Sequence, residues 1–430
     1  MRKINLFTAV SIVIANMIGT GVFTSIGFQL NGIESVFAIM MLWLTGGIIA
    51  LCGALSYGEL GSAMPRSGGE YHYLSVLIHP LVGFLSGWVS VTVGFAAPVA
   101  LAAFAFGKYV NKVYPFLDPN IMAYSVVIIT TIMHCFTLKG SARFQNISTY
   151  VKIALILLFI VAGFLVSVHQ NVSLIPKDSP VTAMSWKSIF TMPFAVSLIY
   201  VSYSYSGWNA SAYMASEIEN PEKSIPKSLL MGTIMVTVLY VLLNFIFLYT
   251  TPVSELKNQV EAGYISGIHI FGSGAGNLIG LMIALLMVSS ISSLVFAGPR
   301  VTRVMGEDIT ALSALAKTNR HGIPVVATLL QSAIALVLIY TSTFDAVVLY
   351  IGFTLSVFTF LTVCSLFILR RGRSGLQAKY KTFGYPVTPL VFLILNGWTL
   401  YSTLSAHPKE SLYGLGTVMA GSVLYFIKKK

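Results

Sequence analysis

The chain has little charge and few cysteines for its length. Charged residues make up 9% of its 430 residues, whereas hydrophobic residues make up 56%. A soluble domain carries about 25% charged residues, so this composition excludes one. The three cysteines, Cys52, Cys135 and Cys364, lie in apolar stretches, which excludes an external disulfide framework. We therefore predict that the chain crosses a membrane several times.

The apolar residues gather in stretches that are interrupted by short charged segments. Twelve such stretches are each near or above the roughly 20 residues that a spanning helix needs. They lie at about residues 5–30, 36–64, 81–107, 120–138, 146–168, 188–214, 228–251, 274–299, 324–344, 346–369, 385–404 and 411–427. This pattern predicts an all-α membrane protein with twelve transmembrane helices.

Lysine and arginine are unevenly distributed over the predicted loops. If the N-terminus is inside, most of them fall on the inner side, including Arg66, Arg300 and Arg370. The positive-inside rule then places both termini in the cytoplasm. The net charge of +12 follows from this topology and gives no support to nucleic-acid binding. We expect a multi-pass protein of the cell (plasma) membrane.

The sequence lacks a convincing enzyme or metal motif. The seven histidines fall in no metal-ligand spacing. Residues 272–276 are rich in glycine, but no strand precedes them and no Lys-Ser/Thr pair follows, as a phosphate loop requires. We predict that the protein is no enzyme and that it has neither a metal site nor a cofactor.

Two of the apolar stretches carry helix-breaking residues at membrane depth. The first contains Gly19 and Gly21, and the sixth contains a polar patch from Tyr203 to Asn209 that includes Gly207. Spans one and six are each the first of five, and breaks at matching positions are typical of secondary transporters built from inverted repeats. A broken helix frees N–H groups for an anion and carbonyl groups for a cation. The alternative is that the small residues only allow close helix packing.

An ordered set of motifs also resembles one known family. The motifs are Ile18-Gly19-Thr20-Gly21-Val22-Phe23, Tyr57-Gly58-Glu59-Leu60, the segment from Pro65 to Tyr71, Gly207-Trp208-Asn209, and the segment from Glu217 to Pro226. Together they resemble the amino acid-polyamine-organocation superfamily and, within it, a bacterial L-type amino acid transporter. The resemblance implies a leucine-transporter-type fold with a 5+5 inverted repeat. Residues 1–168 would hold helices 1–5, residues 169–373 would hold helices 6–10, and residues 374–430 would hold helices 11 and 12.

The resemblance further implies a substrate site at the two breaks. The residues concerned are Ile18, Gly19, Thr20 and Gly21 for the substrate carboxylate, and Tyr203, Ser204, Ser206 and Gly207 for its ammonium group. Tyr203 would act as a lid, although ordinary aromatic packing is the alternative for it. Animal L-type members usually carry Phe at the Tyr203 position and Gly at the Ser206 position. The larger Ser206 is therefore expected to favour small substrates.

Lys152 is a charged residue within the fifth span. A charge at the centre of a spanning helix costs roughly 2.5–3.5 kcal/mol on insertion scales, so we expect a function for it. By the same resemblance it would replace the cation that lies between helices 1 and 8 in sodium-coupled relatives, with Ser289 and Ser290 of helix 8 nearby. Snorkelling of the long side chain toward the interface is the alternative.

Charged residues at the inner ends of the predicted spans have two possible roles. They could form ion pairs that close the transport path on the inner side, or they could only determine the topology of the chain. The expected pairs are Arg66 with Glu59, and Arg300 and Arg303 with Glu307 and Asp308. Exposed pairs of this kind stabilise by only about 0–1 kcal/mol.

These observations predict a sodium-independent exchanger of small neutral L-amino acids, such as alanine, serine and cysteine, that works by alternating access. The alternatives are a proton-coupled symporter of amino acids or polyamines and, less favoured, an ion channel, for which no filter segment is present. The expected partners are small neutral L-amino acids and membrane lipids. Animal members of the L-type branch that the chain resembles carry, between helices 3 and 4, an external cysteine that links to a glycoprotein. The corresponding loop here, residues 107–120, has none, so the resemblance implies no disulfide-linked glycoprotein subunit.

Overall fold

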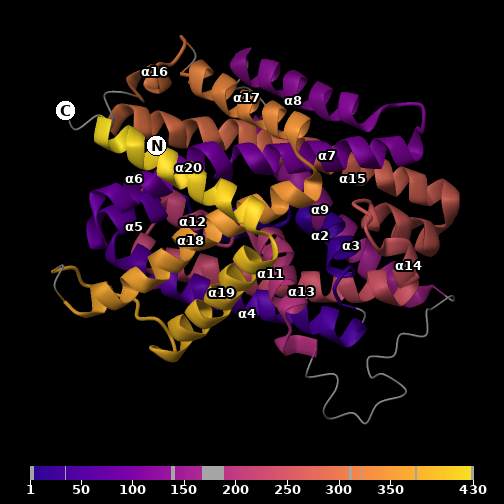
Figure 1. Cartoon of the computed structure of the whole chain (residues 1–430), viewed down its shortest axis with the longest axis horizontal. Coiled ribbons are helices and arrows are strands. Elements are labelled where there is room, and N and C mark those ends of the chain that lie inside the picture. The colour runs from indigo at the N-terminus through magenta and orange to yellow at the C-terminus, as the bar shows by residue number, and fades with distance from the viewer. Residues whose placement is uncertain are drawn as a thin grey trace.

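The computed structural model describes residues 4–33, 35–136, 141–166, 188–308, 312–320, 322–372 and 375–427. Helices dominate these ranges, and no strand occurs in them apart from a single bridge between Ile4 and Ile218. Some of the long helices, such as α7, α8 and α15, run nearly parallel across the view, whereas α18, α19 and α20 run obliquely to them (Figure 1). The all-α architecture expected from composition is confirmed within the described residues.

The helices of the first 165 residues begin with a broken one. Their bounds are α1 Leu6–Met17, α2 Gly21–Thr24, α3 Ile26–Gln29, α4 Val36–Ala63, α5 Glu70–Leu77, α6 Pro80–Val89, the π-helical η1 Ser90–Gly94, α7 Ala96–Val113, α8 Pro119–Phe136 and α9 Ser141–Leu165.

The rest of the described chain starts with a second broken helix. The bounds here are η2 Ser188–Phe190, α11 Met192–Tyr205, α12 Ala210–Tyr213, η3 Ala215–Glu217, α13 Pro221–Thr250, α14 Val253–Leu256, α15 Ala262–Asp308, α16 Ser313–Ala316, α17 Val325–Thr341, α18 Phe344–Arg370, α19 Val387–Ala406 and α20 Pro408–Ile427. Within α15, Gly272 has non-helical backbone angles (φ 79°, ψ 171°), so that two helices meet there.

Short polar side chains define where several helices begin. Asn5 caps α1 by accepting a hydrogen bond from the Thr8 backbone N–H at 2.9 Å. Thr191 and Thr343 cap α11 and α18 in the same way. Each cap satisfies one of the N–H groups that a helix start leaves without a partner. These caps make the helices begin close to the first residues of the predicted apolar stretches.

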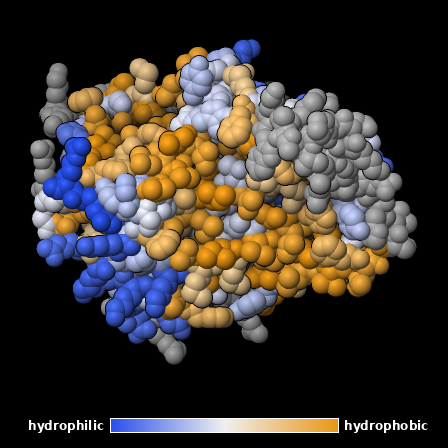
Figure 2. All heavy atoms as spheres, turned by 90° about the horizontal axis from the view of Figure 1, so that it is seen from below, coloured by the Kyte–Doolittle hydropathy of each residue, from blue (hydrophilic) through white to orange (hydrophobic). Residues whose placement is uncertain are grey.

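Nine described helices are long and apolar enough to cross a membrane. Apolar side chains cover most of the surface in Figure 2, while hydrophilic residues gather toward one end. On α8, for example, Ile129 is 57% exposed and Met133 is 64% exposed. Hydrocarbon rather than water suits such a surface. The multi-pass membrane architecture is thus confirmed.

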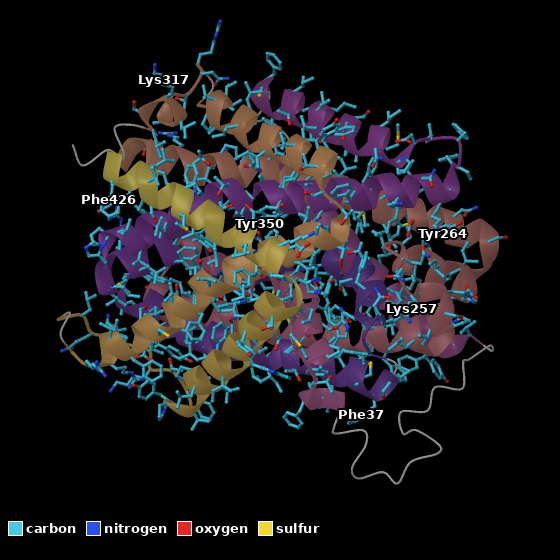
Figure 3. All side chains as sticks on the ribbon, viewed as in Figure 1. Phe37, Lys257, Tyr264, Lys317, Tyr350 and Phe426 are labelled. Carbon is cyan, nitrogen blue, oxygen red and sulfur yellow. The ribbon has the colours of Figure 1, made fainter. Side chains whose placement is uncertain are left out.

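Three of the twelve predicted spans are not among these nine. The corresponding helices are α11 with 14 residues, α17 with 17 residues, and α20. The count of twelve therefore stays a prediction, as do the repeat boundaries. The boundary between residues 168 and 169 lies outside the described residues, as does the one between 373 and 374. The topology inferred from lysine and arginine predicts Lys317 on the inner side and Lys257 on the outer side. The two residues lie at opposite ends of the bundle (Figure 3).

The two broken helices lie against each other inside the bundle. α11 contacts α2 and α3, while α1 contacts α12. α4 and α13 pack against these segments and against each other. The four halves of the broken helices thus surround one central region, where the ends of α1 and α11 face the starts of α2 and α12.

Candidate functional site

The first break separates α1 from α2 at three residues. α1 ends at Met17 and α2 begins at Gly21, so Ile18, Gly19 and Thr20 lie between them. The Met17 carbonyl accepts a hydrogen bond from the Tyr240 hydroxyl of α13 at 2.6 Å. A Cβ atom on Gly19 would contact only the Met17 carbonyl oxygen, at 3.8 Å. The break is therefore held by α13 and leaves open space beside Gly19.

The second break requires glycine for two reasons. Gly207 follows the end of α11 with φ at +96°, a backbone conformation that L side chains rarely adopt. A Cβ atom there would lie 2.8 Å from the carbonyl carbon and oxygen of Asn16. Ser206 carries the turn with a backbone N–H bond to the Tyr203 carbonyl at 3.1 Å. The sequence therefore sets both the turn and the close approach of the two breaks.

Hydroxyl groups join the two breaks. Thr20 Oγ1 and the Tyr203 hydroxyl are 2.7 Å apart and form a buried hydrogen bond across 183 positions of sequence. Ser25 Oγ and Ser204 Oγ are 2.9 Å apart. Gly21 allows this contact, because a Cβ atom on it would lie 2.7 Å from Ser204 Cα. The structure thus brings together Thr20, Gly21, Tyr203 and Ser204, all predicted from the sequence to belong to one site.

The other predicted residues surround this contact differently. Ile18 is fully buried, Gly19 and Gly207 are half-buried, and the Ser206 side chain is exposed. The hydroxyl of Ser206 therefore faces free space rather than the packed contact between the breaks. It occupies the end of α11, where helix carbonyl groups have no helical partners.

A polar network behind the site was not predicted. Gln29 Nε2 donates to Ser25 Oγ at 3.3 Å, and Trp43 Nε1 donates to Gln29 Oε1 at 3.0 Å. The Tyr205 hydroxyl donates to the Trp43 carbonyl at 3.1 Å. Ser25 and Gln29 are four residues apart, so they share one helix face in an apolar stretch. Two polar residues at this spacing in an apolar stretch indicate a polar helix face, and this signal is visible in the sequence.

Aromatic side chains cover the site on one side. Phe28 stacks on Tyr200 with ring centroids 5.9 Å apart and on Phe344 at 5.5 Å. The Tyr200 hydroxyl donates to the Asp345 carboxylate, so α11 is bonded to α18 at this level. α3, α11 and α18 together close this side of the central region.

One face of α1 is exposed. Thr8 and Asn16 are exposed and Ile12 is partly exposed, at a spacing of four residues that puts them on one face. Gly19 continues this face into the break, and Ser206 is exposed beside it. This exposed face of α1 thus leads to the first break.

Lys152 lies inside the bundle, on α9. Its side chain is buried, and its ammonium group donates to Ser290 Oγ of α15 at 2.9 Å. Ser289, which precedes Ser290 on α15, is fully buried. The side chain thus crosses from α9 to α15 and does not extend toward the surface.

One of the expected inner ion pairs is wrong and another is present. Glu59 pairs with Arg370 and not with Arg66: Arg370 Nη2 donates to Glu59 Oε2 at 2.8 Å, and the Thr382 N–H donates to the same oxygen at 2.7 Å. Glu59 is 2% exposed, and burial explains why it takes a partner from α18 rather than the exposed Arg66. Arg303 pairs with Glu307 at 2.7 Å on the surface, as expected. The side chain of Asp308 lies outside the described residues.

Comparison with known proteins gives one family and several relatives along the whole chain. The model of the amino acid permease family matches residues 4–421. The serine/threonine exchanger SteT of Bacillus subtilis (strain 168) is 26% identical over 100% of this chain and 97% of its own. The b(0,+)-type amino acid transporter 1 of Mus musculus is 24% identical over 99% and 88%. The large neutral amino acids transporter small subunit 2 of Mus musculus is 26% identical over 99% and 81%.

Proposed function

Because the chain belongs to the amino acid permease family, we propose that it exchanges small neutral L-amino acids across the membrane without sodium. The predicted resemblance to amino acid transporters is confirmed, and its relatives are transporters rather than enzymes. The leucine-transporter-type fold that the resemblance implied fits the helical architecture. The proposal concerns the finer questions of substrate, coupling and direction.

The meeting of the two breaks carries the proposal. An amino acid has one negative and one positive end. The start of α2 offers N–H groups to the carboxylate, and the end of α11 offers carbonyl groups to the ammonium. The side chains at the contact, Thr20, Tyr203 and Ser204, are uncharged. A net charge on the substrate would find no partner among them, so neutral amino acids are favoured.

Substrate size depends on Ser206 and Tyr203. Ser206 projects its side chain into free space beside the break, while Tyr203 is fixed by Thr20. Both groups reduce the room left for the side chain of the substrate. The name of SteT, a serine/threonine exchanger, fits small substrates, whereas another relative is named for large neutral amino acids.

Lys152 supports independence from sodium. Its ammonium group reaches Ser290 on α15, so a tethered positive charge takes the place proposed for a mobile cation. Exchange without sodium then needs no ion to enter or leave. A proton-coupled symporter of amino acids or polyamines remains the second candidate, since Lys152 is itself a titratable group.

Location and partners complete the proposal. We assign the protein to the plasma membrane with both termini in the cytoplasm, as the distribution of lysine and arginine indicates. We further propose that it works without a disulfide-linked glycoprotein subunit, because residues 107–120 contain no cysteine.

Uptake by purified protein in liposomes tests the proposal. Labelled alanine should enter equally well when sodium is replaced by choline. Unlabelled serine and cysteine should compete strongly, leucine weakly, and arginine and glutamate hardly at all. A strict sodium requirement would overturn the coupling claim, and strong competition by arginine would reveal a charge partner in the site.

A further inference from the structure

Glu70 is a buried carboxyl group between three elements of the inner side. It begins α5 and is 4% exposed. Its Oε1 accepts a hydrogen bond from the Tyr57 hydroxyl of α4 at 2.7 Å and another from Asn209 Nδ2 at 3.2 Å. Asn209 directly precedes α12, the second half of the broken helix. One carboxyl group therefore joins α4 to the start of α12.

The loop before Glu70 packs closely on the same half of the broken helix. The Gly68 N–H donates to the Tyr213 carbonyl at 3.3 Å, and the Ser216 N–H donates to Ser67 Oγ at 3.1 Å. Gly69 has φ at +51°, and a Cβ atom on it would lie 2.8 Å from the Tyr213 ring. We call Tyr57, Glu70, Tyr73, Asn209 and Tyr213 the inner cluster. These residues lie where the loop, α4 and α12 meet.

No cation balances the charge of Glu70. Among the described residues no lysine or arginine forms an ion pair with it, and its second oxygen, Oε2, has no hydrogen-bond partner. α6, which packs on α5, carries no titratable side chain. The charged groups Glu59 of α4 and Arg370 of α18 are paired with each other. A buried carboxylate without a cation is unfavourable.

A second polar group of the inner cluster is also unsatisfied. The Tyr73 hydroxyl is fully buried and has no hydrogen-bond partner in the described part of the chain. Burial, and to a smaller extent the nearby Glu70, raises the pKa of Tyr73. A buried hydroxyl without a partner costs about 1–3 kcal/mol, so the packed inner cluster carries this cost as well.

We propose that Glu70 is a proton-binding site, and that binding of a cytoplasmic proton at Oε2 links the position of α12 to pH during transport. This inference rests on the transport function proposed above. The neutral carboxyl group stabilises the packed inner cluster seen here. Loss of the proton to water leaves a buried charge and favours separation of the loop and α12 from α4. Alternating access in such folds uses this kind of movement of one unit against another.

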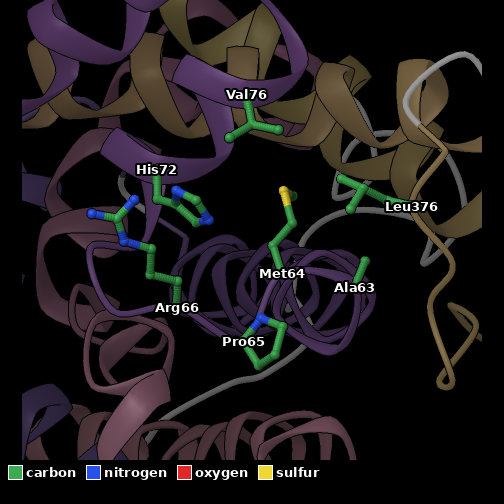
Figure 4. A pocket seen from close by; sticks show the side chains of 7 residues that line it. All are labelled: Ala63, Met64, Pro65, Arg66, His72, Val76 and Leu376. Carbon is green, nitrogen blue, oxygen red and sulfur yellow. The ribbon is translucent and has the colours of Figure 1, made fainter.

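The electrostatics of the cluster agree with this assignment. Burial raises the pKa of Glu70 to about 7, although the hydrogen bonds from Tyr57 and Asn209 oppose the shift. Burial and the nearby Arg66 lower the pKa of His72 from its ordinary value. Arg66 and His72 line an open pocket of about 340 Å³ (Figure 4). The pocket thus lets water reach Arg66, which precedes Glu70 in the sequence, and His72, which follows it.

Thermal unfolding in detergent provides a test that does not need transport. Because the pKa of Glu70 is higher in the folded than in the unfolded protein, its stabilising effect is present at low pH and is lost as the pH rises toward about 7. The Tm of the wild type should fall between about pH 5 and pH 8 more than that of Glu70→Gln. Glu219→Gln, an exposed acidic control, should follow the wild type.

Exchange of alanine in liposomes of controlled internal pH tests the link to transport. The protonated fraction of a group with this pKa changes about tenfold between about pH 6 and pH 8, so the wild-type rate should change several-fold. Glu70→Gln should be insensitive to pH and match the wild type at low pH. His72→Asn should keep the wild-type profile.

A second variant keeps the proposal testable if Glu70→Gln does not fold. Tyr57→Phe removes a donor that stabilises the carboxylate, so the midpoint of both pH profiles should move to higher pH. An unmoved midpoint, or a Glu70→Gln variant with the wild-type dependence of Tm on pH, would overturn the proposal. If the wild type exchanges no amino acid at all, the proposed function fails while the Tm measurement still decides on Glu70.

Discussion

The hydrogen bond between Thr20 and Tyr203 leads to a quantitative prediction about the substrate site. Both side chains are buried, with Thr20 5% and Tyr203 8% exposed, and their oxygens are 2.7 Å apart. Tyr203→Phe removes one partner and leaves the Thr20 hydroxyl unsatisfied, which costs about 1–3 kcal/mol. Thr20→Val likewise leaves the buried Tyr203 hydroxyl without its partner. Because the bond is present without substrate, each single variant should lower the free energy of unfolding by about 1–3 kcal/mol.

The double variant distinguishes this bond from two independent effects. When both hydroxyls are removed, no buried donor or acceptor is left without a partner. Thr20→Val/Tyr203→Phe should therefore lose less than the sum of the two single losses, with a coupling energy of about 1 kcal/mol. Unfolding of the wild type and of each variant, followed in the same detergent, measures it. Additive losses would show that the two breaks are not joined through this bond.

Three further predictions concern other parts of the site. Lys152→Ala should lower alanine exchange more than about tenfold while folded yield stays within about twofold, because its ammonium group joins α9 to α15; unchanged exchange kinetics would argue for a merely structural lysine. Ser206→Gly should increase competition by leucine, because it removes an exposed side chain and keeps the carbonyl groups of α11; competition equal to the wild type would contradict this role. Gly207→Ala should lower the Tm strongly, since a Cβ atom would lie 2.8 Å from the Asn16 backbone at a φ of +96°; thermal unfolding without a loss of Tm would disprove the close approach.

The sequence predicted local features of the site well. The glycines at positions 19, 21 and 207 indicated both breaks, because glycine is unfavourable in the interior of a helix. The positions of α1, α2 and α11 follow from these residues and from the apolar stretches around them. A resemblance in motifs then indicated the family, which the match over residues 4–421 confirms.

Contacts between distant segments could not be predicted in the same way. Thr20 and Tyr203 are 183 positions apart, and helical periodicity says which face is polar but not which helix it meets. Glu59 was assigned to Arg66 from proximity in sequence, whereas the fold gives it Arg370, 311 positions away. Glu70 was missed for a related reason: it lies outside the predicted spans, and only the packing of its loop on α12 buries it.

Acceleration of uptake by internal substrate tests the central claim, exchange by alternating access, most directly. Liposomes containing the purified protein would be loaded with unlabelled alanine or left empty, and labelled alanine would be added outside in sodium-free choline medium. The account predicts uptake that saturates with concentration and is several-fold faster into loaded liposomes. Uptake that does not saturate and is equally fast into empty liposomes would contradict it.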